Sequence, residues 1–183
     1  MPADTTAKNK FNEIAKEVYE PLQRYLLRRA PRHDAEDALS EVLLTVWRRL
    51  DDAPIDRPLP WCYGIARRTL ANQRRGQRRA LRLVERLQSE PAEHQPDPGD
   101  AVADPRLAQA LEQLNDHDSE ILRLWAWEQL EPREIAIALD ISANAATLRL
   151  SRAKKKLSLE MRRQDPGLSG HKPSRGTEEH PDG

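Results

Sequence analysis

Apolar side chains recur at intervals of three and four residues along most of this chain, which places them on one face of successive α-helices. The first such stretch covers residues 11–26, where Pro21 is expected to interrupt and restart the helix. Asp34 suits the N-cap of the next helix, over residues 35–50. Glycine is scarce and alternating strand patterns are almost absent. The sequence therefore predicts an all-α protein.

The later helices follow in the same way. Their expected positions are from Trp61 through about Leu87, from Asp104 and Pro105 onward, after a cap at Asp116 or Asp118, from Pro132 to Leu139, and from about Ala143 to Met161. Trp125 and Trp127 fall on the helix after Asp118, where we expect them in the core and at its edge.

Charge is distributed unevenly although the net charge of the 183 residues is zero. Nine arginines and one acid lie between residues 57 and 86, and seven basic residues and one acid lie between 144 and 163. Residues 87–105 carry five acids and no Lys or Arg. This pattern indicates two small domains that contact nucleic acid, joined by a flexible acidic linker. The expected boundaries are a disordered N-terminus at 1–7, a first domain at 8–87, the linker at 88–105, a second domain at 106–161 and a disordered tail at 162–183.

Residues 131–157 have the pattern of a helix-turn-helix. Pro132 suits the first turn of a helix, Asp140 tolerates the left-handed turn that follows, and Ser142 suits the N-cap of the second helix. Ala146 and Leu150 can face the first helix, which leaves an outward face that is small, polar and basic, as a helix in a DNA major groove requires. The alternative is a helical hairpin with a solvated basic face.

The loop at residues 51–60 is rich in proline and should be extended. The helix after it carries Trp61 and a dense stripe of arginines. An aromatic ring beside phosphate-neutralising cations is the combination that single-stranded DNA favours. Trp61 could equally be a core residue.

Other functional classes find little support. Cys62 is the sole cysteine and the five histidines show no ligand-like spacing, so we expect no metal and no cofactor. No apolar run reaches the ~20 residues of a membrane span, and the N-terminus lacks a signal-peptide pattern. We therefore expect a soluble, cytoplasmic protein without membrane contact of its own, and not an enzyme.

In the order of its parts, the chain resembles the extracytoplasmic-function (ECF) group of bacterial sigma factors. The resemblance rests on four stretches: DAEDALSEVLLTVWRRL (34–50), WCYGIARRTLANQRR (61–75), LEQLNDHDSEILRLWAWEQLEPREIAIAL (111–139) and SRAKKKL (151–157). It implies one domain that docks on core RNA polymerase and opens the −10 promoter element, and another that reads the −35 element. It also implies an anti-sigma factor as a partner.

The resemblance also assigns roles to individual residues. The core-polymerase contacts would be Asp37, Glu41, Trp47 and Arg48, on a helix that meets the clamp helices of the largest subunit. The −10 contacts, to the single non-template strand, would be Trp61, Arg67, Arg68, Asn72, Arg74, Arg75, Arg78 and Arg79. The −35 contacts, to duplex DNA, would be Asn144, Thr147, Leu148, Ser151, Arg152 and Lys155.

Some positions depart from the pattern of the family. Arg68 and Asn72 stand where Asn and Asp are common, and Asp140 replaces the usual turn glycine. Two other readings stay open. The acid pair Asp37 and Glu41 is either ordinary surface charge or a docking ridge, and the whole chain is either a sigma factor or a helix-turn-helix regulator that binds duplex DNA without polymerase.

Overall fold

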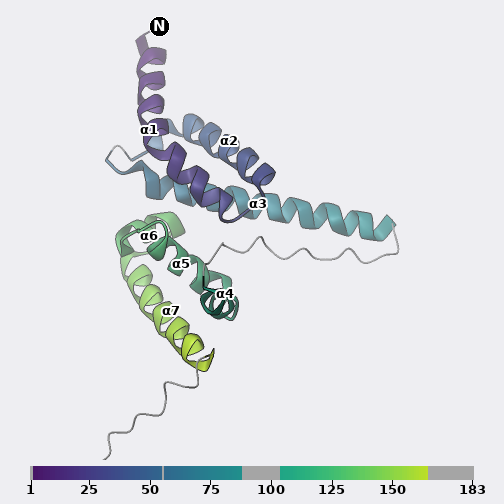
Figure 1. Ribbon diagram of the computed structural model, residues 1–183. Coiled ribbons are helices and arrows are strands. Elements are labelled where there is room, and N and C mark those ends of the chain that lie inside the picture. The colour runs from purple at the N-terminus through teal and green to yellow at the C-terminus, as the bar shows by residue number, and fades with distance from the viewer. Residues whose placement is uncertain (1, 55, 88–103, 165–183) are drawn as a thin grey trace, which may run out of the picture.

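The computed structural model describes residues 2–54, 56–87 and 104–164. Across these ranges the chain is helical, with no strand, as the periodicity predicted. The helices are α1 (Pro2–Leu27), α2 (Arg32–Arg48), the short 3₁₀ helix η1 (Leu50–Asp52), α3 (Pro58–Leu87), α4 (Pro105–Glu112), α5 (Asp116–Ala126), α6 (Pro132–Leu139) and α7 (Ala143–Gln164). Helices α1–α3 form one bundle and α4–α7 a second (Figure 1).

The first bundle is closed by a long, continuous α1. The helix passes through Pro21 without a break, so the expected restart there is wrong. A proline inside a helix removes one backbone hydrogen bond, but the side chains around it pack into the core. Val18, Leu22 and Leu26 are fully buried against α2 and α3. The helix already begins at Pro2, earlier than the expected start at residue 8.

Two helix starts lie earlier than predicted. Helix α2 begins at Arg32 with Pro31 at the N-cap position, so Asp34 lies inside the first turn instead of capping it. Its carboxylate accepts a hydrogen bond from Gln77 Nε2 of α3 at 3.1 Å. Helix α5 is capped by Asn115, whose Oδ1 accepts from the Asp118 backbone N–H at 2.9 Å. An aspartate in the first helical turn still stabilises the positive end of the helix, which explains why the sequence signal was displaced by a few residues.

The helix-turn-helix has the local structure that its sequence predicted. Glu131 and Glu134 form a capping box at the start of α6, with Pro132 in its first turn. Asp140 adopts the left-handed conformation (φ 57°, ψ 52°) that ends α6. Ser142 Oγ then accepts from the Ala145 backbone N–H at 3.2 Å and caps α7. The paired helices α6 and α7 bury Ala146 and Leu150 between them, as expected.

The last helix of each bundle ends near an expected domain boundary, and the boundaries themselves stay predictions. Helix α3 ends at Leu87, where the first domain was expected to end, and α7 continues to Gln164, beyond the expected residue 161. Most of the expected linker (88–103) and of the tail (165–183) lies outside the described residues.

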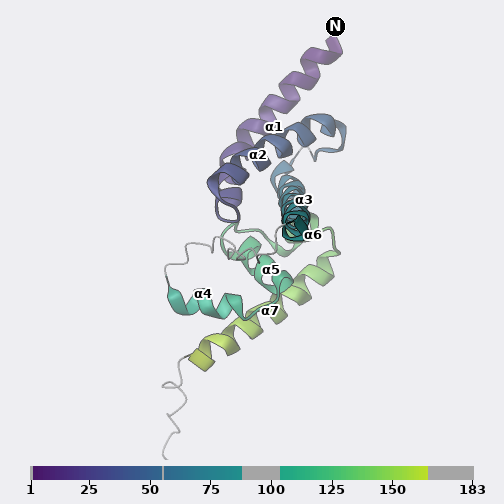
Figure 2. The ribbon, with the colours of Figure 1, turned by 90° about the vertical axis from the view of Figure 1, so that its right-hand side faces the viewer.

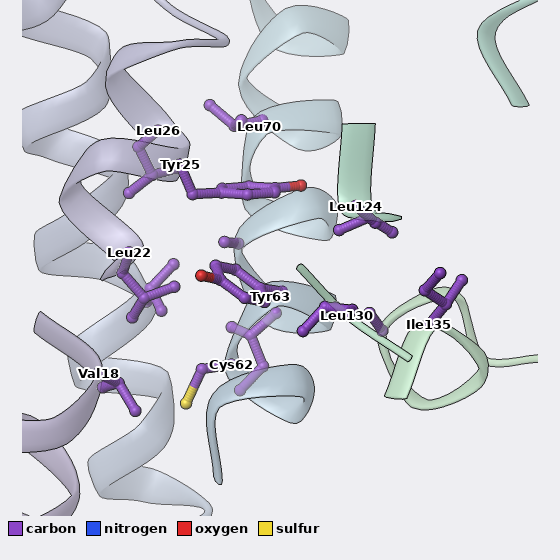
Figure 3. Packing of buried hydrophobic residues seen from close by; sticks show 14 of the residues in the cluster. Val18, Leu22, Tyr25, Leu26, Cys62, Tyr63, Leu70, Leu124, Leu130 and Ile135 are labelled. Atoms are coloured by element: carbon purple, nitrogen blue, oxygen red, sulfur yellow. The ribbon is translucent and has the colours of Figure 1, made fainter. Parts of the chain in front are cut away.

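The two bundles lie against each other. Figure 2 shows α6 beside α3, with α7 running away from the contact. The rings of Tyr25 of α1 and Tyr63 of α3 are tilted toward each other, with centroids 4.9 Å apart, next to Leu124, Leu130 and Ile135 of the second bundle (Figure 3). All five side chains are buried and belong to one hydrophobic cluster that continues from one bundle into the other. The sequence did not predict this contact.

Candidate functional site

The outward face of α2 carries the residues expected to meet polymerase. Asp37, Glu41 and Arg48 are exposed at spacings of four and seven residues, so they lie along one stripe of the helix. Trp47 borders that stripe, 38% exposed, with its ring edge-on to Phe11 at 5.3 Å between centroids. The structure brings all four predicted residues together on one exposed face.

Leu44 belongs to the same stripe and was not predicted as a site residue. Its side chain is 46% exposed, between the acidic and the aromatic parts of the face. It could have been found from its position, because it lies outside the apolar stripe that faces the core and seven residues after Asp37. Together with Trp47 it gives the face an apolar centre.

The first turns of α3 hold the ring and the cations expected to contact the −10 strand. Trp61 is half-buried, with the Arg49 guanidinium 5.6 Å from its ring centroid, so the ring serves packing and keeps an accessible part. Arg67 is half-buried as well. Arg68 is exposed and forms an ion pair, because its Nη2 donates to Asp140 Oδ2 at 2.9 Å across the contact between the bundles.

The remaining predicted arginines follow α3 outward, and they do not share one environment. Arg74 Nη2 donates to the Arg29 backbone carbonyl at 2.8 Å, which ties α3 to the end of α1. Arg75 Nη2 donates to Asn72 Oδ1 at 2.6 Å, on the helix surface. Arg78 and Arg79 are exposed on the part of α3 that projects past the bundle (Figure 1). The arginine stripe therefore includes one side chain, Arg74, that joins two parts of the first bundle.

Helix α7 presents the face expected to read duplex DNA. The six predicted residues are all exposed: Asn144, Thr147, Leu148, Ser151, Arg152 and Lys155. Thr147 Oγ1 donates to the Ala143 carbonyl at 3.0 Å, which fixes its rotamer and leaves its methyl group outward. The opposite face is buried through Ala146, Leu150 and Ala153. The helix is thus anchored on one side and exposed on the other.

Trp125 corrects one expectation for the second bundle. We expected a core residue, but the ring is 43% exposed, and Lys154 Nζ of α7 lies 3.4 Å from its centroid. Trp127, expected at the core edge, is half-buried between the guanidinium groups of Arg28 and Arg123, each 5.9 Å from its ring centroid. Arg28 belongs to the first bundle, so Trp127 also contributes to the contact between bundles.

The described residues contain neither a candidate metal site nor a candidate membrane span. They include no group of three or more His, Cys, Asp and Glu side chains close enough to hold a metal ion. None of the described helices is long and apolar enough to cross a bilayer. Cys62 is fully buried in the first bundle, and this burial, with a smaller effect of Glu17, raises the pKa of its thiol to about 12.

Comparisons with known proteins agree with this geometry. The family model of Sigma-70 region 2 matches residues 14–80, and the family model of Sigma-70, region 4 matches residues 105–157. No curated protein sequence matches the chain significantly.

Among the solved structures that share its fold are two complexes. One is the sigma factor RpoE in complex with the anti-sigma factor NepR from Bartonella quintana, at 19% identity and a TM-score of 0.60, covering 83% of this chain and 96% of that one. The other is CnrH in complex with the cytosolic domain of CnrY, at 23% identity and a TM-score of 0.55, covering 81% and 85%.

The matched regions divide as the bundles do. Region 2 covers most of α1–α3, with the exposed stripe of α2, and region 4 covers α4–α6 and most of α7, with the helix-turn-helix. The chain therefore belongs to the sigma-70 family and is a sigma factor that directs transcription initiation.

Proposed function

We propose that the α2 stripe is the surface through which this sigma factor docks on core RNA polymerase. The observation that carries the assignment is the exposed combination of Asp37 and Glu41 with Leu44 and Trp47 on one helix face. Carboxylates suit a basic partner surface and increase the rate of encounter, while the apolar centre gives contact area that stays buried in the complex.

The start of α3 and the loop before it hold the single non-template strand of the −10 element. Trp61 supplies a partly accessible ring for stacking, and Arg68, Arg78 and Arg79 supply exposed cations for phosphate. Capture of an unpaired base on this surface offsets the unstacking cost of a few kcal/mol and so drives melting.

Helix α7 reads the −35 element in the duplex. Arg152 and Lys155 contact phosphate, while Thr147 and Leu148 meet base edges, where the methyl groups of both side chains suit contact with thymine. The protein performs no bond chemistry of its own and works in the cytoplasm, where polymerase and promoter are found. An anti-sigma factor controls it by covering these surfaces. The similar sigma factor RpoE is seen in complex with the anti-sigma factor NepR, and CnrH is seen in complex with the cytosolic domain of CnrY.

Promoter-directed transcription with purified core polymerase tests the docking surface. Wild type should support specific initiation, and Asp37→Arg/Glu41→Arg should lose it together with core affinity. A matched control is Glu13→Arg/Glu17→Arg, which reverses two exposed acids at the same spacing on α1 and should keep both.

Two results would count against the proposal. Equal loss of core affinity in the control would mean that charge reversal anywhere on the bundle is sufficient. A wild-type protein that fails to bind core but binds duplex promoter DNA tightly would be a conventional helix-turn-helix regulator.

A further inference from the structure

Ion pairs of one polarity join the two bundles. The basic partner lies in the first bundle and the acidic partner in the second: Arg28 with Glu128, Arg29 with Glu120 and Glu128, Arg57 with Glu134, and Arg68 with Asp140. The first bundle thus uses cations, and the second uses carboxylates, at the surface where they meet.

Arg29 is the centre of this surface. Its side chain is 6% exposed, and its guanidinium lies 3.7 Å from the Tyr25 ring centroid. Its Nε donates to Glu120 Oε2 at 3.3 Å and its Nη1 to Glu128 Oε1 at 3.0 Å. The side chain of Glu128 is 3% exposed and also accepts from Arg28 Nη2 at 2.6 Å. Two carboxylates of α5 and its following turn are therefore held by two arginines of the turn that follows α1.

Tyr25 completes the network from the first bundle. Its hydroxyl donates to Glu120 Oε1 at 3.0 Å. Burial, and then the negative charge of Glu120, raise the pKa of Tyr25 well above its usual value, so the phenol stays a donor. Burial opposes the charge on Arg29, but Glu120, Tyr25 and Glu128 outweigh it and raise its pKa. The side chains of Arg29 and Glu128 are almost closed to water, so removal of one charge would leave the other buried without a counter-charge.

The exposed ion pairs lie on the surface proposed for the −10 strand. Arg57 is in the loop before α3, and Arg68 is on α3 one turn beyond Gly64. A Cβ atom at Gly64 would lie 3.2 Å from the Ala138 carbonyl oxygen, so the backbone of α6 rests directly on this part of α3. Helix α6 and the turn after it therefore lie where the DNA strand would bind. Glu134 and Asp140 supply the negative charge that the DNA phosphates would otherwise supply.

This arrangement does not fit a promoter. A spacer of the usual size for this class, roughly 16 base pairs at ~3.4 Å each, separates the two elements by on the order of 55 Å. In the structure Arg68 is 2.9 Å from Asp140, and α7 begins three residues after Asp140. The two DNA-reading surfaces are adjacent here and must separate to reach both elements.

We propose that the structure is a closed, self-inhibited state, in which α6 and its turn act as an internal acidic competitor for the −10 surface and the Arg29–Glu120–Glu128 network is the latch. This inference rests on the proposed function of α3. The latch needs no partner chain, so the free sigma factor is closed on its own and opens when core polymerase and promoter bind its two surfaces.

The distance between the bundles in the free protein tests the latch. Nitroxide labels go on Ser40→Cys of α2 and Ser158→Cys of α7, both exposed positions, while buried Cys62 stays unlabelled. Double electron–electron resonance on wild type should give one short population. Glu120→Gln/Glu128→Gln keeps the shape of both side chains and removes their charge, and should lower the closed-to-open ratio by roughly tenfold or more, since it leaves Arg29 buried without a counter-charge.

Two further variants make the result decisive. Glu112→Gln/Asp116→Asn removes the same charge from exposed positions of the second bundle and should keep the short population. Gly64→Leu should open the protein without changing any charge, because its side chain has no room beside Ala138. Circular dichroism checks that each variant keeps its helices. A wild type that is already open, or a short population that persists in both opening variants, would overturn the latch.

Binding of a fluorescent 12-nucleotide single strand of mixed sequence tests the competition. The Glu120→Gln/Glu128→Gln variant should bind roughly tenfold more tightly than the Glu112→Gln/Asp116→Asn control, which has the same net charge. Equal affinities would show that α6 does not compete with DNA. Failure of wild type to initiate transcription with core would instead count against the proposed function, because the distance measurement does not depend on it.

Discussion

At the scale of single residues, Asp140 joins a predicted role to an unpredicted one. The sequence placed it at the turn of the helix-turn-helix, and its φ of 57° bears this out. Its contact with Arg68 could not be predicted, because the two residues are 72 positions apart and no local pattern links them. Local backbone demands are visible in a sequence, whereas a pairing between exposed charges on different bundles is not.

The left-handed conformation makes a graded prediction. Asp140→Asn and Asp140→Val both remove the charge that faces Arg68, but only Asn tolerates positive φ. The valine variant should be less stable than the asparagine variant by about 1–2 kcal/mol. Urea unfolding of both variants gives the difference directly. Equal midpoints would mean that the turn relaxes to another conformation.

The thiol of Cys62 makes a second prediction at this scale. Because Cys62 is fully buried, native protein at pH 8 should react with Ellman's reagent only as fast as it unfolds, and immediately in denaturant. Its folded pKa of about 12 lies above the ordinary 9.0, so its contribution to stability is complete below pH 9 and is lost as the pH rises toward 12. Rapid reaction of one thiol under native conditions would contradict this burial.

At the scale of helices, periodicity predicted the elements better than their ends. Periodicity predicted a helix over residues 35–50, and its apolar positions Leu39, Val42 and Val46 are buried on α2. Helix starts were displaced where several polar residues compete for the cap, as at Asn115, because Asp, Asn and Ser suit both the cap and the first turn. Pro21 shows the opposite error, since buried packing on both sides outweighs one missing hydrogen bond.

The exposed face of α7 gives a prediction for the −35 element. Lys155→Ala should weaken binding to duplex promoter DNA about equally for all sequences and lower the slope of log affinity against log salt by about 0.9, as expected for one lost phosphate contact. Leu148→Ala should change the preference among base sequences with the slope unchanged. Fluorescence anisotropy at several salt concentrations separates the two effects, with Lys16→Ala of α1 as a control. A Lys155→Ala slope equal to that of wild type would remove this residue from the phosphate contacts.

At the scale of the whole molecule, the sequence predicted two helical bundles and left their contact unknown. The buried pair Arg29 and Glu128 is separated by 99 residues, and each side chain alone reads as surface charge. Burial of such groups becomes predictable only when both partners are known to meet. The apolar part of the contact could not be predicted for a similar reason, because Tyr63 and Leu130 fit ordinary helical stripes within their own bundles.

The continuous core predicts cooperative unfolding. One hydrophobic cluster runs through both bundles, so wild type should lose helix content and tryptophan fluorescence in a single coincident transition with urea. The Glu120→Gln/Glu128→Gln variant should show two transitions, because uncoupled bundles unfold at their own stabilities. Two transitions in wild type would mean that the contact contributes little free energy.

The opposed charges of the two bundles also shape how the protein responds to its ionic surroundings. Dissolved salt weakens the attraction between arginine and phosphate, and it equally screens the exposed pairs that Arg57 and Arg68 form with the second bundle. A rise in salt concentration therefore weakens both the binding of the −10 strand and the binding of the internal competitor. As the salt concentration in the cell changes, promoter affinity should change less steeply than the number of arginines alone predicts. The carboxylates of Glu134 and Asp140, which compete for the same arginines, thus keep transcription more constant.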